Sequence, residues 1–203
     1  MLGLAWRPAP AEIAEADHLL ADPLIGALNV ALAKARAART SAADEIVVAA
    51  DTLVVAAGTI LGKPATPDEA RTMLRELRER PHAVLTGVAL RTADDRCWGG
   101  VVSTRVWMRR YEEAEIAAYV GRGEPFDKAG GYAIQDSVFR PVERLDGCYL
   151  NVVGLPLCGV ASGLESLGVR PGLVDDGEAP PAPRVPPCAY CRAGAPVVQI
   201  TPA

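Results

Sequence analysis

The chain has 203 residues, of which half are apolar and 23% are charged, and its 21 basic and 25 acidic residues give a formal net charge of −4. These fractions are typical of a globular protein and exclude a collagen-like or wholly disordered chain. The mildly acidic balance argues against long nucleic acid as a partner. No stretch approaches the roughly 18 consecutive apolar residues of a membrane-spanning helix, so we expect no membrane partner. The N-terminus does not resemble a secretion signal, and the five cysteines are interpreted as reduced thiols, which predicts a cytoplasmic protein.

The first half of the chain alternates helical and strand-like patterns. Apolar residues at helical spacing predict a helix over 23–39. The run EIVVAADTLVVAAGTIL predicts a buried strand, an interruption at Asp51-Thr52 and a second apolar run. The tetrapeptide TPDE at 66–69 combines a threonine N-cap, a proline at the first helical position and a glutamate three residues after the cap, and its helix ends before Pro81. Strands are expected next over 82–90 and 101–108.

The second half continues the alternation up to Gly168. Residues 112–120 predict a helix, and a glycine-containing loop leads from there to short strands expected near 138–143 and 149–153. A last helix is expected from Pro156 to Gly168. Residues 171–203 hold eight of the 17 prolines without any apolar period, so they predict a disordered tail. The pattern as a whole predicts the α/β class, with a mixed twisted sheet and flanking helices.

Asp51 is the first candidate for chemistry, because the prediction places it at the carboxyl end of the apolar strand IVVAAD. Open α/β sheets place ligand-binding groups at such ends. A carboxylate there can accept a proton, orient a water or hold a divalent cation. It can equally be a turn residue that caps the chain reversal, and its position alone favours neither interpretation.

Lysine is the rarer basic residue in this chain, since only Lys34, Lys63 and Lys128 among the 21 basic residues are not arginine. A compact ammonium suits sites that a planar guanidinium does not. Lys63 and Lys128 lie in loops beside glycines, where ammonium and backbone N–H groups together can surround phosphate oxygens. For any single lysine the simpler interpretation is a solvated turn residue. Two such loops flanking the Asp51 strand favour phosphate binding.

The remaining patterns carry less weight. The chain has two histidines, His18 and His82, and no catalytic triad can be built on them. For His82 the simpler role is a hydrogen bond at the edge of its strand. Cys188-x-x-Cys191 supplies half of the ligands that a structural zinc site needs, and an incidental pair is the simpler interpretation.

Seven segments together resemble the septum-formation (Maf) family of nucleoside triphosphate pyrophosphatases. They occur in the family's order and extend over roughly residues 1–169. The segments are VALAKARA (30–37), VVAADTLVV (47–55), ILGKP (60–64), the helix 66–79, RPHAVLTGVAL (80–90), GEPFDKAGGYAIQ (123–135) and NVVGLPL (151–157). The resemblance implies the family's fold, with two lobes around a cleft.

The resemblance also implies roles for individual residues. Asp51 corresponds to the proton acceptor that activates a water for attack on the α-phosphorus. Lys34, Lys63 and Lys128 match the lysines that line the triphosphate cleft. Thr52 and Gln135 match the family's residues that help to select the nucleotide base. A divalent cation, Mg²⁺ or Mn²⁺, is implied as cofactor, with Asp51 and Glu15 as its ligands.

The occurrence of ADTLVV together with DKAGGYAIQ is similar to the branch of the family that hydrolyses dTTP and UTP. The resemblance therefore implies a nucleoside triphosphate as substrate and pyrophosphate as a product. A homodimer is also expected. The family's first strand and its SxSxRR phosphate loop have no counterpart in these 203 residues, so the expectation is an N-terminally truncated domain over 1–169 followed by the Pro-rich tail 170–203. The alternative function is a catalytically impaired nucleotide-binding or regulatory relative linked to cell division.

Overall fold

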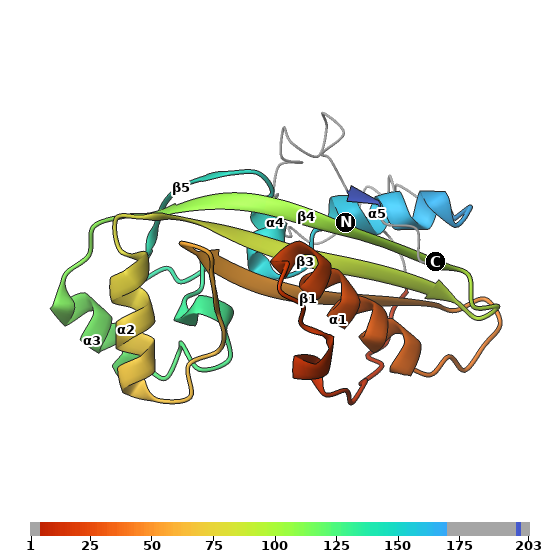
Figure 1. Cartoon of the computed structure of the whole chain (residues 1–203), viewed down its shortest axis with the longest axis horizontal. Helices are drawn as coiled ribbons and strands as arrows, with labels where there is room; N and C mark the ends of the chain where they lie inside the picture. Colours follow the sequence, from red (N-terminus) through yellow and green to blue (C-terminus); the bar gives the residue numbers. More distant parts are fainter. Residues whose placement is uncertain (1–4, 170–197, 200–203) are drawn as a thin grey trace, which may run out of the picture.

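The computed structural model describes residues 5–169 and 198–199, and its central feature is one antiparallel sheet. Five strands follow the order β2-β1-β3-β4-β5, and β6 pairs with β4. Figure 1 shows β1, β3 and β4 as long ribbons that cross the molecule side by side. The strands are β1 (Ile46–Ala56), β2 (Thr59–Leu61), β3 (Pro81–Thr92), β4 (Cys97–Met108), β5 (Val142–Asp146) and β6 (Val198–Gln199).

The expectation of a mixed sheet is wrong for the described residues, where every strand pairing is antiparallel. The reason lies in the connections. β2 folds back on β1 as a hairpin, and the following helix returns the chain to the end of the sheet at which β1 finishes. β3 therefore starts beside the end of β1, with Ala83 opposite Val55, and runs in the opposite direction. The short connection at 93–96 then makes β3 and β4 a second hairpin.

Helices cover both faces of this sheet (Figure 1). One face carries α1, whose apolar residues pack on Leu85, Ala89 and Val101, and the other carries α5, which packs on Val88 and Leu90. A third core joins α2 and α3 to the end of the sheet where β1 finishes. The helices are α1 (Pro23–Ala37), α2 (Pro67–Leu77), α3 (Glu113–Gly121), α4 (Tyr149–Val153) and α5 (Leu157–Ser166), with 3-10 turns at Glu15–His18 and Ala129–Gly131.

Most predicted elements are confirmed, including the start of α2, where the Thr66 hydroxyl accepts a hydrogen bond from the Glu69 N–H at 3.2 Å. The strand expected over 149–153 is wrong, because this segment is the single-turn helix α4. Its Asn151 is fully buried and donates its amide N–H groups to the Val84 carbonyl and the Thr104 hydroxyl. Gly154 then ends the helix in the left-handed conformation, with φ +117°.

The predicted tail falls almost entirely outside the described residues, and so do Cys188 and Cys191; of this segment only Val198–Gln199 is described, as β6. Within the described part of the chain, no helix has the length and apolarity that crossing a membrane requires.

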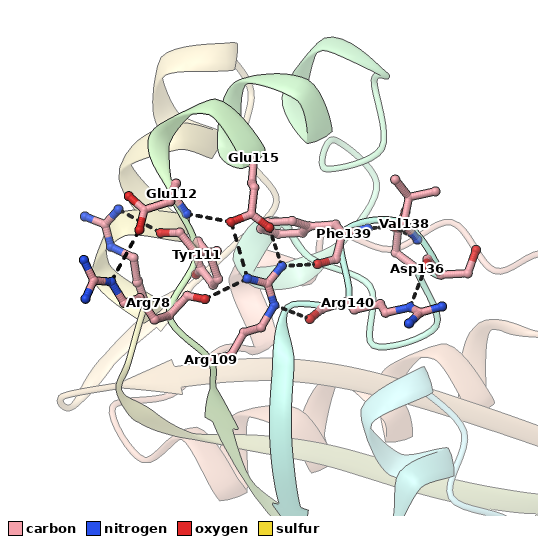
Figure 2. A network of polar contacts seen from close by, with 11 residues as sticks. Arg78, Arg109, Tyr111, Glu112, Glu115, Asp136, Val138, Phe139 and Arg140 are labelled. Carbon is pink, nitrogen blue, oxygen red and sulfur yellow. Dashed lines mark hydrogen bonds and ion pairs between the residues drawn. The ribbon is translucent and has the colours of Figure 1, made fainter.

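Arg109, which follows β4, joins the sheet to α3 and to the loop 136–140 (Figure 2). Its guanidinium donates to both carboxylate oxygens of Glu115 and to the carbonyls of Phe139, Arg140 and Arg110, at 2.5–3.4 Å. The Glu115 carboxylate also accepts from the Glu112 N–H at the start of α3. One side chain thus satisfies acceptors on the residue that follows it, on α3 and on the loop 136–140, which lies about 30 residues further along the chain.

Replacing this arginine is expected to destabilise the fold. Arg109→Met keeps most of the side-chain length but leaves several acceptors without their donor, and hydrogen bonds to a charged group stabilise by about 1.5–3 kcal/mol each. Arg110→Met is the matched control, because Arg110 is 74% exposed and forms one ion pair of 3.4 Å. Urea unfolding of both variants checks this: the expected loss is about 2 kcal/mol or more for Arg109→Met and within about 0.5 kcal/mol for the control. Equal losses would contradict the role given to Arg109.

Candidate active site

A cleft of about 600 Å³ opens between α1, the middle of β1, β2 and the loop that carries the 3-10 turn Ala129–Gly131. All seven residues that the sequence put forward for the site line it, although they come from five separate parts of the chain. These residues are Glu15, Lys34, Asp51, Thr52, Lys63, Lys128 and Gln135.

Asp51 lies inside a continuous strand, so the predicted interruption at Asp51-Thr52 is wrong. It pairs in register with Gly87 of β3, and Thr52 pairs with Thr86. Successive side chains of a strand point to opposite faces, so Asp51 points towards α1 and Thr52 towards α4. Both reach one cleft because β2 pairs only with the last three residues of β1 and leaves the edge beside Asp51 uncovered by any described strand.

The closest charged group to Asp51 is the ammonium of Lys34, which lies on α1. Lys34 Nζ is 2.7 Å from Asp51 Oδ1 and 2.7 Å from Glu15 Oε1, so one ammonium joins two carboxylates. Burial lowers the pKa of Lys34, but the hydrogen bonds to Asp51 and Glu15 and the negative charges of the two carboxylates together raise it above its usual value. Because an ammonium has three N–H donors, one stays available for a ligand oxygen in the cleft.

Glu15 belongs to the 3-10 turn that precedes α1. The hydrogen bond from Lys34 lowers the pKa of Glu15 against the opposing effect of its partial burial, and the positive charge of Lys63 adds to the lowering. Glu15 is therefore a carboxylate at neutral pH. The structure thus places Glu15, Lys34 and Asp51 together at one wall of the cleft.

The other two lysines stand on the loops that follow β2 and α3. Lys128 Nζ donates to the Glu124 carbonyl at 2.7 Å and to Asp127 Oδ1 at 2.5 Å. That hydrogen bond lowers the pKa of Asp127, and the charge of Lys63 contributes to the same direction. Lys63 forms no ion pair with any residue that the structure describes. The two loops meet through the Gly130 N–H, which donates to the Gly62 carbonyl at 3.0 Å.

His82 forms a hydrogen bond as expected, but the expected place at a strand edge is wrong. It is buried in β3, which lies inside the sheet and not at its edge, and its Nε2 is 2.7 Å from the hydroxyl of Tyr132 in the cleft wall. Burial lowers the pKa of His82 to about 4, so the imidazole is neutral at pH 7. The pair joins β3 to the loop that carries Lys128 and Gln135.

Sequence reasoning missed a polar group behind Thr52. The Thr52 and Thr86 hydroxyl oxygens are 2.9 Å apart, and the Thr86 hydroxyl donates to the Asn151 carbonyl at 3.2 Å. A threonine inside the apolar run HAVLTGVAL was the available signal. This threonine did not reveal the contact, because the register in which β1 pairs with β3 cannot be read from the sequence of either segment alone.

The donor set for a divalent cation is small. No group of three or more histidine, cysteine or acidic side chains that could hold a metal occurs in the part of the chain that the structure describes. Mg²⁺, however, is commonly bound by one or two carboxylates together with substrate phosphates and water. Asp51 and Glu15, held on either side of the Lys34 ammonium, fit that mode of binding.

Comparison with known proteins identifies the family. The model of the Maf-like protein family matches residues 2–167, which is most of the chain. The chain belongs to the Maf-like family. A protein of Dehalococcoides mccartyi is 39% identical over 170 residues, which are 83% of this chain and 75% of that protein. One from Thermomicrobium roseum is 46% identical over 132 residues, 65% of this chain and 58% of its own length. One from Citrifermentans bemidjiense is 39% identical over 169 residues, 82% of this chain and 86% of that protein. Each of the three is named dTTP/UTP pyrophosphatase.

Proposed function

We propose that this Maf-like protein hydrolyses dTTP and UTP to the nucleoside monophosphate and pyrophosphate. The observation that carries the proposal is the meeting of Asp51 with Lys34, Lys63 and Lys128 in a single cleft. The relatives bear the name of this activity, and the match to the family extends over all four residues. In this proposal residues 1–169 form the catalytic domain, with α1 in one lobe and α2 and α3 in the other.

The lysines are the proposed triphosphate-binding groups. Ammonium groups form strong, charge-assisted hydrogen bonds with phosphate oxygens. Lys34 has a donor left after binding its two carboxylates, and Lys63 lines the cleft without an ion-pair partner among the described residues. Lys128 is positioned by Asp127 and the Glu124 carbonyl. A triphosphate between the walls would meet positive charge from both sides.

Asp51 is the proposed general base. It would accept a proton from a water whose oxygen attacks the α-phosphorus, while the bond from that phosphorus to the oxygen bridging to the β-phosphorus breaks and pyrophosphate leaves. Phosphoryl and nucleotidyl transfer depend mainly on positioning and on stabilising the charge that develops on the oxygens. The Asp51 carboxylate is only 11% exposed and fixed by Lys34, so its orientation is restricted.

A divalent cation would be held by Asp51 and Glu15, and when bound it neutralises phosphate charge. Removing divalent cations with a chelator is expected to lower the rate about a hundredfold or more, since such an ion contributes several kcal/mol to transition-state stabilisation. Adding back Mg²⁺ or Mn²⁺ should restore the rate. A rate that is insensitive to the chelator would contradict the cofactor assignment.

The base is the second part of the substrate to be recognised, and Thr52 and Gln135 are the proposed groups for it, since both line the cleft. We place the enzyme in the cytoplasm, where nucleoside triphosphates are made and used. A homodimer is proposed as its assembly, and the sedimentation coefficient of the purified chain tests that part separately.

The direct test is product analysis. The purified chain is incubated with dTTP or UTP and with Mg²⁺ or Mn²⁺, and the products are separated by ion exchange. Equal amounts of monophosphate and pyrophosphate are expected. Release of phosphate one unit at a time would contradict the proposal, and nucleotide binding without turnover would favour the impaired, regulatory alternative.

A further inference from the structure

Behind the cleft, a short chain of hydroxyl groups leads from Thr52 into the core. Thr86 of β3 is fully buried and does not line the cleft. Its Oγ1 is 2.9 Å from Thr52 Oγ1 and 3.2 Å from the carbonyl oxygen of Asn151. Thr52 Oγ1 is also 3.5 Å from the Gly154 carbonyl oxygen. Asn151 is itself fixed by Val84 and Thr104, so its carbonyl is a rigid acceptor.

Counting hydrogens decides what Thr52 can offer to a ligand. Each hydroxyl has one hydrogen, and a buried hydroxyl must donate it within the protein. In the first arrangement Thr52 donates to Thr86, which donates to Asn151. In the second, Thr86 donates to Thr52, which donates to the Gly154 carbonyl.

The first arrangement has the shorter bonds, but both use the Thr52 hydrogen inside the protein. What the hydroxyl has left to offer a ligand is then an oxygen lone pair. Thr52 would have to give up an internal hydrogen bond before it could donate to a ligand, and such a bond is worth about 0.5–1.5 kcal/mol.

We propose that Thr86 is a positioning residue that fixes the Thr52 hydroxyl as a hydrogen-bond acceptor towards the cleft, and that this acceptor selects nucleotide bases with a ring N–H. Thymine and uracil carry such an N–H at N3, whereas cytosine has a bare nitrogen acceptor there. An acceptor facing an acceptor leaves both without a hydrogen-bond partner in the complex. The proposal rests on the proposed function, and it assigns the preference for thymine and uracil over cytosine to a residue that does not contact the substrate.

Thr86→Val tests the proposal, because valine keeps the shape and removes both hydrogen bonds of the hydroxyl. The Thr52 hydroxyl then keeps only the longer contact of 3.5 Å to the Gly154 carbonyl, so its hydrogen can turn towards a ligand at a smaller cost. The ratio of kcat/KM for dTTP to that for dCTP is expected to fall about three- to tenfold, the equivalent of one hydrogen bond. Thr86→Ser, which restores a hydroxyl, should return the ratio towards that of the unmodified enzyme.

Thr92→Val is the matched control. Thr92 is a buried threonine in the same strand. Its hydroxyl donates to the Asp94 carboxylate and accepts from the Arg96 N–H in the turn after β3, away from the cleft. In this variant the ratio of kcat/KM for dTTP to that for dCTP should be unchanged. If Thr86→Val lowers kcat/KM for both nucleotides equally, Thr86 has only a structural role and the proposal is overturned.

A binding measurement separates this proposal from the proposed function. Calorimetry gives the ratio of the Kd values for dTMP and dCMP, and Thr86→Val should reduce it by the same factor whether or not the enzyme turns over. Absence of hydrolysis by the unmodified chain would refute the proposed function, while an unchanged binding ratio would refute the role of Thr86. If the valine variant does not fold, Thr86→Ala is measured in its place, with the same expected result.

Discussion

Asp51→Asn is expected to reduce kcat for dTTP by about a hundred- to ten-thousandfold, the range that a general base contributes. Asparagine has nearly the same size, but its amide does not accept a proton from water. The fold should be retained, because Lys34 keeps its second partner, Glu15. Pyrophosphate release by the purified variant is the measurement, together with a thermal melt to show that the variant is folded.

Asp68→Asn is the control for that experiment. Asp68 is a 95% exposed residue in the first turn of α2, where it pairs with Arg71. The same change of chemistry there should leave kcat as it is. A kcat for Asp51→Asn close to that of this control would show that Asp51 is not the base.

The second large effect concerns Gly87, the residue opposite Asp51 in the sheet. A Cβ at this position would lie 2.7 Å from Leu28 Cα and nearer still to the Ala27 carbonyl, and both belong to the backbone of α1. The glycine therefore allows α1 to approach the sheet closely, and α1 carries Lys34 to Asp51. Backbone atoms of a packed helix cannot give way as a flexible side chain can.

Gly87→Ala is accordingly expected to destabilise the fold by about 3 kcal/mol or more, the upper part of the range for overpacking. For a chain of this size that lowers Tm by roughly 6–12 °C. Gly121→Ala is the matched control, since no atom lies within 4 Å of a Cβ at that position. The difference in Tm between the two variants is the measurement. Equal melting temperatures would contradict the close packing of α1 on β3.

Local patterns in the sequence predicted most of the elements, because their causes are local. The Thr66 cap and the apolar stripe of α1 act within a few residues of chain. The mixed sheet and the interrupted strand at Asp51 were wrong because both depend on pairing. β3 runs alongside ten residues of β1 without a break, and this long ladder keeps Asp51 and Thr52 extended. Similarly, α4 forms around the buried contacts of Asn151 with β3 and β4.

Site residues could be predicted from the sequence where they lie in one of the family's motifs. The structure brings these residues to one cleft; they are Glu15, the three lysines, Asp51, Thr52 and Gln135. The roles of these residues stay predictions. Thr86 could not be anticipated, because it lies 34 positions from Thr52 in the sequence and the contact between their hydroxyls depends on the register of β1 with β3. Side chains that act through another side chain leave little trace in a motif.

Isotope labelling tests the central claim, which is attack of water on the α-phosphorus. The unmodified chain is incubated with dTTP in ¹⁸O-labelled water, and mass spectrometry locates the label in the products. One ¹⁸O atom is expected in dTMP and none in pyrophosphate, because the water oxygen becomes bonded to the α-phosphorus. Label in pyrophosphate, or in released phosphate, would mean that water attacks a different phosphorus, and would contradict the assignment of this cleft.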